Sequence, residues 1–327
     1  MGDTKVIIDT DAGVDDAIAV LLAINLLPRG SVVALTSTFG NVDLHQANLN
    51  LTQILAHASD QSIPIFSGAH KPLISSMSSK WAGHGVDGLG GSIGVAPYTP
   101  PSENHAVSAL LRFAKAHPKE LTIVAIGPAT NLALAAMLDP TFVENLKEVI
   151  YMGCTTRDQG NTTPHAEFNV ASDPEAAHIL LTQFAQKLTI VSWETVCDAH
   201  LTWAVYDELV ALRTPTARFL QRIFSAYEQY RPSASSGKHQ EFILCDAYAT
   251  ALLVADCATD VSFATGRVEL SEGPTRGACH WVPSAAPATK LVHMFDVDRF
   301  KALLRHLMEE RGALHGSTPS RHPEKET

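Results

Sequence analysis

Four carboxylates lie within eight residues near the amino end of the chain, at Asp9, Asp11, Asp15 and Asp16. Acids this close repel one another unless a bound cation or raised pKa values relieve the repulsion. A helix N-cap with solvated surface acids is the structural alternative, but one Asp is enough for a cap. No His or Cys lies within the cluster, and oxygen-only donors suit hard cations such as Ca²⁺ or Mg²⁺. The cluster therefore predicts a metal site.

The chemistry expected of such a site is hydrolysis. Calcium accepts roughly six to eight oxygen ligands in irregular geometry, which leaves room for a water and two substrate hydroxyls. A cation lowers the pKa of a bound water, and an adjacent carboxylate can then remove its proton. The acidic cluster is therefore interpreted as the centre of a hydrolase site.

Further polar groups are expected at the same edge of the fold, because they follow other apolar runs. Ile126 ends one run, and its main-chain carbonyl could ligate the ion. Asp246 stands at the start of the helical run 247–254, where an acid could complete the metal shell. Amides and an acid that could bind hydroxyls are supplied by Asn41, Asn161, Glu167 and Asn169.

The elements that must position these residues alternate between short apolar runs and helical patterns. Helices are predicted over 16–27, 45–58 and 106–116, and strands over 6–8, 32–37, 64–66, 121–126, 149–152 and 188–191. Continuous apolar strands alternating with helices favour a mainly parallel central sheet flanked by helices, a Rossmann-like α/β fold. Ligands bind such sheets at the carboxyl ends of the strands. The acidic cluster follows the first strand and occupies that position.

Two stretches interrupt this alternation. Residues 81–94 contain six glycines together with Trp81 and His84, and residues 231–239 are rich in Ser with Pro and Gly. Long loops of this kind are usually active-site lids or binding loops, so both are predicted to be mobile. No linker divides the chain, and we predict one domain over 1–314 with a disordered polar tail over 315–327.

Composition limits the possible partners. The 327 residues are 46% hydrophobic and 18% charged, with a formal net charge of −10. This charge offers no basic field for nucleic acid, so a neutral small-molecule substrate is favoured. No apolar stretch is long enough to span a membrane. The five cysteines are widely spaced, which predicts reduced thiols in a cytoplasmic setting.

In this order, the motifs resemble the nucleoside hydrolase (nucleoside N-ribohydrolase) family. The resemblance begins with the fingerprint at 8–17 and ends at Cys245-Asp246-Ala247, so it covers almost the whole chain. Between them lie Gly40-Asn41, Gly127-Pro128-Ala129-Thr130-Asn131, Met152-Gly153, Ala166-Glu167-Phe168-Asn169 and Ser172-Asp173-Pro174-Glu175-Ala176-Ala177. The family implies calcium-dependent cleavage of the N-glycosidic bond of ribonucleosides, and assembly as a homodimer or homotetramer.

The resemblance also implies roles for individual residues. Asp11 is expected to be the general base and a calcium ligand, and Asp9 to orient the loop. The other metal ligands are expected to be Asp16, Asp246 and the main-chain oxygen of Ile126. The ribose is expected to be held by Asp15, Asn41, Met152, Asn161, Glu167 and Asn169.

Activation of the leaving base is less well defined, because Cys245 stands where many relatives carry a His, as in a subgroup of the family. With a usual pKa of about 8.5, a thiol is a poor acid for a nucleobase nitrogen. Aromatic residues suit nucleobase stacking and favour purine nucleosides such as inosine and guanosine. The residues considered for base binding or leaving-group activation are Trp81, His84, Trp193, Tyr227, Tyr230, His239 and Cys245.

Two other functions remain open from sequence. A haloacid-dehalogenase-type phosphatase also begins with Asp-x-Asp, but it needs a basic residue for phosphate, and Lys is scarce near these motifs. A nucleoside- or ribose-binding protein without turnover would be marked by loss of Asp11 or Asp16, and both are present.

Overall fold

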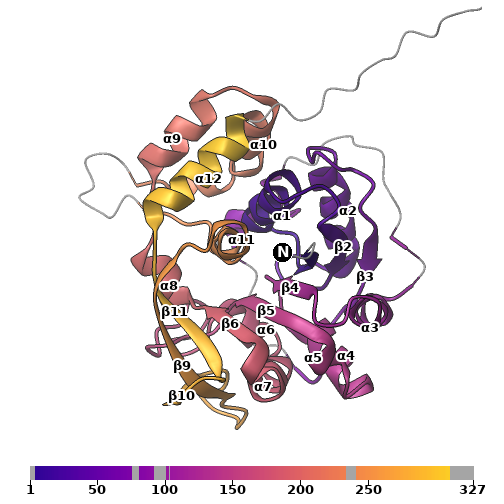
Figure 1. Ribbon diagram of the computed structural model, residues 1–327. Coiled ribbons are helices and arrows are strands. Elements are labelled where there is room, and N and C mark those ends of the chain that lie inside the picture. Colours follow the sequence, from indigo (N-terminus) through magenta and orange to yellow (C-terminus); the bar gives the residue numbers. More distant parts are fainter. Residues whose placement is uncertain (1–3, 76–80, 92–100, 103, 233–240, 310–327) are drawn as a thin grey trace, which may run out of the picture.

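The computed structural model describes residues 4–75, 81–91, 101–102, 104–232 and 241–309. Its centre is a nine-stranded sheet in the order β10-β9-β11-β6-β5-β4-β1-β2-β3 (Figure 1). The run from β11 to β3 is parallel, and β9 is antiparallel to both of its neighbours, which confirms the predicted mainly parallel sheet. The strands are β1 (Lys5–Thr10), β2 (Val32–Ser37), β3 (Ile65–Ser67), β4 (Leu121–Ala125), β5 (Leu146–Met152), β6 (Leu188–Val191), β9 (Ala258–Val268), β10 (Cys279–Pro283) and β11 (Thr289–Phe295). A separate two-stranded ribbon pairs β7 (Leu201–Thr202) with β8 (Glu241–Phe242).

Strand order places a topological switch point between β1 and β4. The chain proceeds from β1 to β2 and β3 on one side, and then continues with β4, β5 and β6 on the other. In open parallel sheets a crevice forms at such a point, outside the carboxyl ends of the strands. Asp9 of β1 lies beside Ala125 of β4 in the register, so the residues after both strands meet at this crevice.

Helices cover both faces of the sheet (Figure 1), which is why the strands are apolar on both sides. Ile8 packs into one layer and its neighbour Ile7 into the other, as the alternation of side chains along a strand requires. The first layer contains α1 (Val14–Leu26), α2 (Leu44–Leu55), α8 (Trp193–Asp198), α9 (Trp203–Ala211), α10 (Pro215–Ile223), α11 (Cys245–Ala255) and α12 (Val297–Glu309). The second contains α3 (Ala106–Ala116), α4 (Thr130–Leu138), α5 (Phe142–Asn145), α6 (Phe168–Ser172) and α7 (Pro174–Gln183). Short 3₁₀ turns are formed by Ala82–His84, Ala185–Lys187 and Tyr227–Tyr230.

Two helices begin earlier than the sequence predicts. Helix α1 starts at Val14 and α11 at Cys245, so Asp15, Asp16 and Asp246 all lie in first turns. Asp16 stabilises its helix end directly, because its Oδ2 accepts the main-chain N–H of Gly13 at 2.8 Å. Acidic side chains at this position also complement the positive end of the helix dipole.

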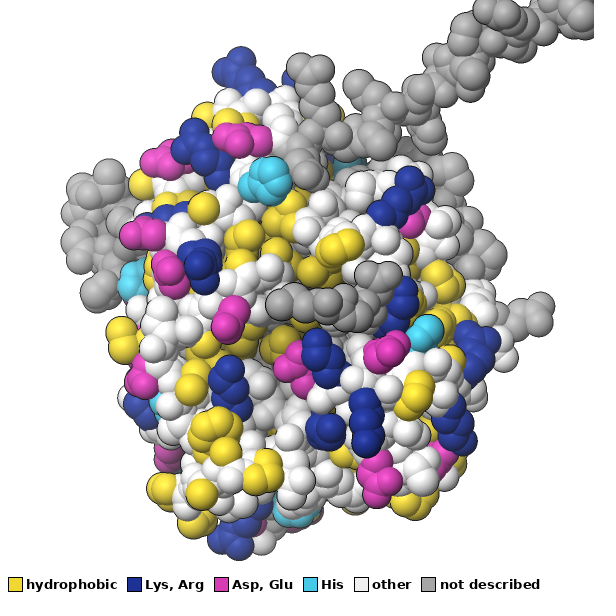
Figure 2. Space-filling model, in the orientation of Figure 1, with side chains coloured by type: hydrophobic (Ala, Val, Ile, Leu, Met, Phe, Trp, Pro, Cys, Tyr) yellow, Lys and Arg dark blue, Asp and Glu magenta, His cyan; other side chains and the backbone are white. Residues whose placement is uncertain are grey.

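The face shown in Figure 2 carries side chains of both charge signs, interspersed as on a solvated surface. Within the described ranges, no helix has the length and hydropathy needed to cross a bilayer. The predicted tail 315–327 and His239 lie outside the described residues, as does most of the second predicted loop. The single-domain boundary at 314 stays a prediction.

Candidate active site

Asp9 fixes the carboxyl end of β1 through hydrogen bonds to two neighbouring elements. Its side chain is fully buried, and its Oδ2 accepts bonds from the Thr36 hydroxyl at 2.6 Å and the Asn131 amide at 2.8 Å. Burial raises the pKa of Asp9 to about 7, although both hydrogen bonds oppose the rise. Asn131 also donates to the carbonyl of Ser37 and accepts the N–H of Ala69. Through Asp9 and Asn131, β1, β2 and α4 are therefore fixed to one another.

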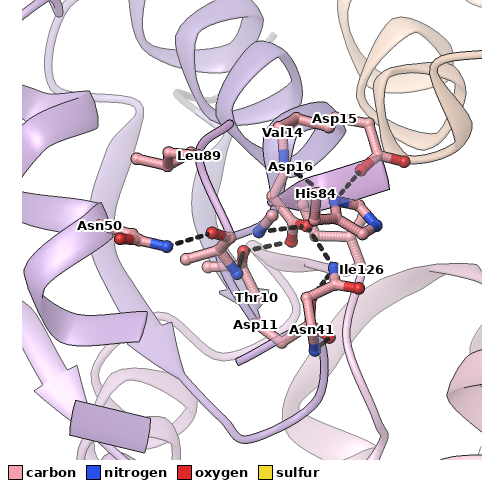
Figure 3. Close-up of polar contacts among 12 residues, drawn as sticks. Thr10, Asp11, Val14, Asp15, Asp16, Asn41, Asn50, His84, Leu89 and Ile126 are labelled. Carbon is pink, nitrogen blue, oxygen red and sulfur yellow. Dashed lines mark hydrogen bonds and ion pairs between the residues drawn. The ribbon is translucent and has the colours of Figure 1, made fainter. Parts of the chain in front are cut away.

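The loop that follows β1 is held in a tight turn by Thr10. Its hydroxyl donates to Asp16 Oδ1 at 2.5 Å and accepts the N–H of Ala12 at 3.0 Å (Figure 3). Ala12 adopts a left-handed conformation, with φ of 57°. A Cβ on Gly13 would lie 2.5 Å from the amide nitrogen of Asn41, so any larger residue there would displace the Asn41 side chain.

Asn41 connects two of the carboxylates. Its main-chain N–H donates to Asp11 Oδ2 at 2.7 Å, and its side-chain amide donates to Asp11 Oδ1 at 3.0 Å and to Asp16 Oδ2 at 3.2 Å. The preceding Gly40 is in close contact with Asp11, because an added Cβ would lie 1.9 Å from Asp11 Oδ2. The turn after β2 thus determines where the Asp11 carboxylate points.

Asp15, Asp16 and Asp246 form a carboxylate cluster, with one oxygen of each lying within 4.8 Å of the others. The packing of α11 against α1 brings Asp246 to the first two. Burial raises the pKa of all three, and mutual repulsion raises those of Asp16 and Asp246 further. Asp11 lies next to this cluster, and burial and the charge of Asp16 raise its pKa well above the usual value.

This donor set fits a hard cation. Buried acids that repel one another can all ionise when a metal ion neutralises them. Asp15 Oδ1 is buried without a hydrogen-bond partner, as expected of an oxygen that serves a ligand. The cluster shares Asp16 and Asp246 with the predicted ligand set and adds Asp15, while ligation by Asp11 and by the Ile126 oxygen stays a prediction.

Asn169 and Glu167 add further polar groups to the same site. Asn169 donates its amide to the carbonyls of Ile126 at 3.3 Å and Met152 at 3.1 Å. Glu167 caps α6 by accepting the N–H groups of Asn169 and Val170, and it also accepts that of Cys154. Burial raises the pKa of Glu167 to about 7.

A cavity of about 590 Å³ opens above these groups. Its wall contains most of the residues that the sequence singled out, brought together from widely separated segments. Asp11 and Asp16 are not among the lining residues, and Asn41 contacts both. The lining consists of Val14, Asp15, Asn41, Trp81, Ala82, His84, Ile126, Met152, Asn161, Thr162, Glu167, Phe168, Asn169, Trp193, Tyr227, Tyr230, Ile243, Cys245 and Asp246.

The lining of the cavity combines polar groups with aromatic rings. Trp81 lies with its ring centroid 5.0 Å from that of Tyr227 and 5.5 Å from that of Tyr230. Trp81 and Tyr230 are 42% and 50% exposed, so both rings are available to a ligand. Trp193, at the start of α8, also lines the cavity.

His84 and Cys245 line the cavity near the carboxylates, and burial shifts the pKa of both side chains. His84 Nδ1 accepts the N–H of Val14 at 3.3 Å, which leaves the ring proton on Nε2 (Figure 3). Burial lowers the pKa of His84 to about 4, so the imidazole is neutral at pH 7. Burial and the neighbouring Asp15 and Asp246 raise the pKa of the Cys245 thiol well above its usual value.

Sequence reasoning missed several lining residues. Phe168 stands between Glu167 and Asn169, and its place in that motif was a usable signal. The other lining residues were not singled out in the sequence, and only the fold brings them to the cavity. They are Val14, Ala82, Thr162 and Ile243.

The fold and the site together define an α/β enzyme of the hydrolase class, with a cavity beside a carboxylate cluster suited to a metal ion. A family model described as inosine-uridine preferring nucleoside hydrolase matches residues 6–302, and the chain belongs to this family. It is 37% identical to the Arabidopsis thaliana protein named probable uridine nucleosidase 2, over 72% of this chain and 73% of that relative. It is 35% identical to an inosine-uridine preferring nucleoside hydrolase of Crithidia fasciculata, over 68% of this chain and 70% of the relative. A solved inosine-guanosine nucleoside hydrolase superimposes with a TM-score of 0.83 at 30% identity, covering 93% of this chain and 98% of the other.

Family membership confirms the resemblance and the enzyme class: the chain is a glycosidase that hydrolyses N-glycosyl compounds. It also removes the phosphatase alternative.

Proposed function

We propose that this protein hydrolyses the N-glycosidic bond of purine ribonucleosides, such as inosine and guanosine, in a calcium-dependent reaction. The observation that carries the proposal is the mixed lining of one cavity. It combines carboxylates and amides suited to a cation and to ribose hydroxyls with aromatic rings suited to a nucleobase.

The ion would be held by Asp11, Asp16, Asp246 and the main-chain oxygen of Ile126. Bound there, calcium would lower the pKa of water and orient substrate hydroxyls. Asp11 would accept the proton of the attacking water, and Asn41 keeps its carboxylate oriented for that task. Water adds across the bond, so that hydroxyl joins the sugar carbon and a proton joins the base.

The ribose hydroxyls would be bound by Asp15, Asn41, Asn161, Glu167 and Asn169, with Met152 lining the sugar pocket. Carboxylates beside the sugar would stabilise the positive charge that develops as the bond breaks. Positioning of the reactants in this way contributes several kcal/mol to rate enhancement.

The base would stack between Trp81, Trp193 and the tyrosines Tyr227 and Tyr230. Such stacking would bind the base and fix its orientation. His84 and Cys245 line the same cavity, and the raised pKa of the thiol argues against Cys245 as the proton donor. His239 lies outside the described residues.

The test is a hydrolysis assay with inosine, guanosine, adenosine, uridine and cytidine, run with calcium and with a chelator. We expect free ribose with kcat/KM highest for inosine or guanosine, loss of turnover with chelator, and recovery on calcium addition. Absence of ribose from every nucleoside would favour a non-catalytic binding protein. Faster cleavage of uridine than of either purine would overturn the base preference, and turnover undiminished by chelator would overturn the metal requirement.

We further propose a cytoplasmic location, supported by five cysteines that are all free thiols. Assembly as a homodimer or homotetramer is a proposal from family likeness, and sedimentation velocity would test it.

A further inference from the structure

Glu194 is a buried acid that the proposed reaction does not use. It lies in the first turn of α8 and is 1% exposed. Its carboxylate accepts main-chain N–H groups from three residues of one loop: Thr156 at 2.9 Å, Arg157 at 2.7 Å and Gln159 at 3.3 Å. The Thr156 hydroxyl adds a longer contact of 3.4 Å to the same carboxylate.

These bonds hold the backbone of a segment whose side chains make further contacts: Arg157 pairs with Asp198 at 2.6 Å, and His165 with Asp158 at 2.8 Å. The loop leaves β5 through Cys154, whose φ of 71° is left-handed, and Asp158 is left-handed as well, with φ of 60°. Residues without regular structure and with strained backbone need such anchors to hold one conformation. Hydrogen bonds from N–H groups to a buried carboxylate are among the stronger ones available.

Asn161 is the residue through which this loop reaches the cavity. Asn161 is itself exposed, and its side-chain oxygen accepts a bond from the hydroxyl of neighbouring Thr162 at 3.3 Å. Because this bond is local, the position of Asn161 depends on the backbone that carries it. The two residues before Asn161 are each held by one main-chain bond. Gly160 donates its N–H to the carbonyl of Pro164, and Gln159 donates its N–H to the carboxylate of Glu194.

The same carboxylate belongs to the turn that carries Trp193. Trp193 lines the cavity and donates its main-chain N–H to the carbonyl of Cys154 at 3.1 Å. Ser192 contacts the Thr156 hydroxyl at 3.2 Å. The first turn of α8 and the loop 154–161 are thus joined at several points, with Glu194 making the central connection.

We propose that Glu194 is a positioning residue that holds Asn161 against the ribose by fixing the loop 154–161 to the first turn of α8. This inference rests on the proposed nucleoside hydrolysis and adds a determinant of substrate binding to it. Glu194 acts through the loop and contacts no substrate.

The test is Glu194→Gln, which keeps the size of the side chain but replaces one acceptor oxygen by a donor facing N–H groups. Misplacement of a substrate-binding group by about 1 Å costs on the order of 100-fold in efficiency. We expect kcat/KM for inosine to fall roughly 10- to 100-fold, mostly through KM, because ribose binding by Asn161 stabilises the ground state and the transition state alike.

A double-mutant cycle with Asn161→Ala separates positioning from general stability. If Glu194 acts through Asn161, Glu194→Gln changes kcat/KM less than about threefold in the Asn161→Ala background. The full 10- to 100-fold decrease in that background, or a Glu194→Gln single variant within about twofold of wild type, would overturn the inference. Should Glu194→Gln fail to fold, Glu194→Asp replaces it in the cycle, because it keeps the charge but is one methylene too short for all three N–H groups.

The matched control is Glu175→Gln. Glu175 is also a shielded acid in the first turn of a helix, paired with Arg276 and outside the cavity lining. We expect this variant to lose stability and keep KM. Amide exchange of residues 155–162 should rise in Glu194→Gln and stay unchanged in Glu175→Gln; unchanged exchange in both would overturn the inference even without turnover. An inactive wild type with the expected exchange difference would count against the proposed function alone.

Discussion

Gly40→Ala offers a sharp test of how the turn after β2 controls Asp11, since only one methyl group is added. That methyl would lie 1.9 Å from Asp11 Oδ2 and 2.7 Å from its Cγ. To reach ordinary contact the carboxylate must move by roughly 1.5 Å. Asn41 would lose its alignment at the same time, because its N–H donates to the same oxygen at 2.7 Å.

A displacement of this size should lower kcat/KM for inosine by about 100-fold or more, which corresponds to about 2.7 kcal/mol of transition-state stabilisation. Overpacking of this kind costs about 1–3 kcal/mol of folding stability, so the variant should still fold. The assay is ribose release under kcat/KM conditions with calcium present, together with urea unfolding to measure stability.

Gly273→Ala is the matched control. Gly273 has a similarly unusual φ of 142°, compared with 158° at Gly40, but an added methyl would meet no atom within 4 Å. It should retain wild-type turnover, so backbone strain alone would not explain a decrease in Gly40→Ala. If Gly40→Ala stayed within about threefold of wild type, the orientation of Asp11 by this turn would not matter for the reaction.

Two further predictions concern Asp11 itself and His57, a histidine that does not line the cavity. Asp11→Ala should abolish detectable ribose release while circular dichroism stays native, because it removes the proposed base; near-normal kcat would remove Asp11 from that role. His57 stacks on Phe219 at 4.1 Å, and burial, aided by the nearby Arg222, lowers its pKa to about 4 from 6.5. Because the imidazole binds a proton more tightly in the unfolded chain, protonation favours unfolding. The free energy of unfolding should therefore decrease as the pH falls from 6.5 towards 4. His57→Phe keeps the stack and should flatten that pH dependence in urea unfolding; an unchanged pH slope would contradict it.

Much of the fold could be predicted from local patterns. The apolar runs indicated β4 and β6 nearly to the residue, because strands buried on both faces carry an unbroken apolar signal. The start of β5 at Leu146 was missed, because Lys147 and Glu148 interrupt the apolar pattern. The spacing of the first acidic motif similarly predicted a site at the end of β1.

The supporting contacts could not be predicted, because they join distant segments. The amide of Asn131 reaches Asp9 across 122 positions, and His84 reaches Val14 across 70. Glu194 carried no signal at all, since a single acid after a tryptophan is ordinary in sequence. Only the packed structure shows that it collects three N–H groups.

The packing of α11 against α1 has a consequence for how the chain matures during synthesis. Asp246 lies 230 positions after Asp16, so it joins Asp15 and Asp16 only after the long segment between them has been made. Contacts between such distant segments form late and slowly, after the intervening loops have closed. A nascent chain that ends before Asp246 therefore has an incomplete acid set, and capture of an ion would report that α11 has packed against α1.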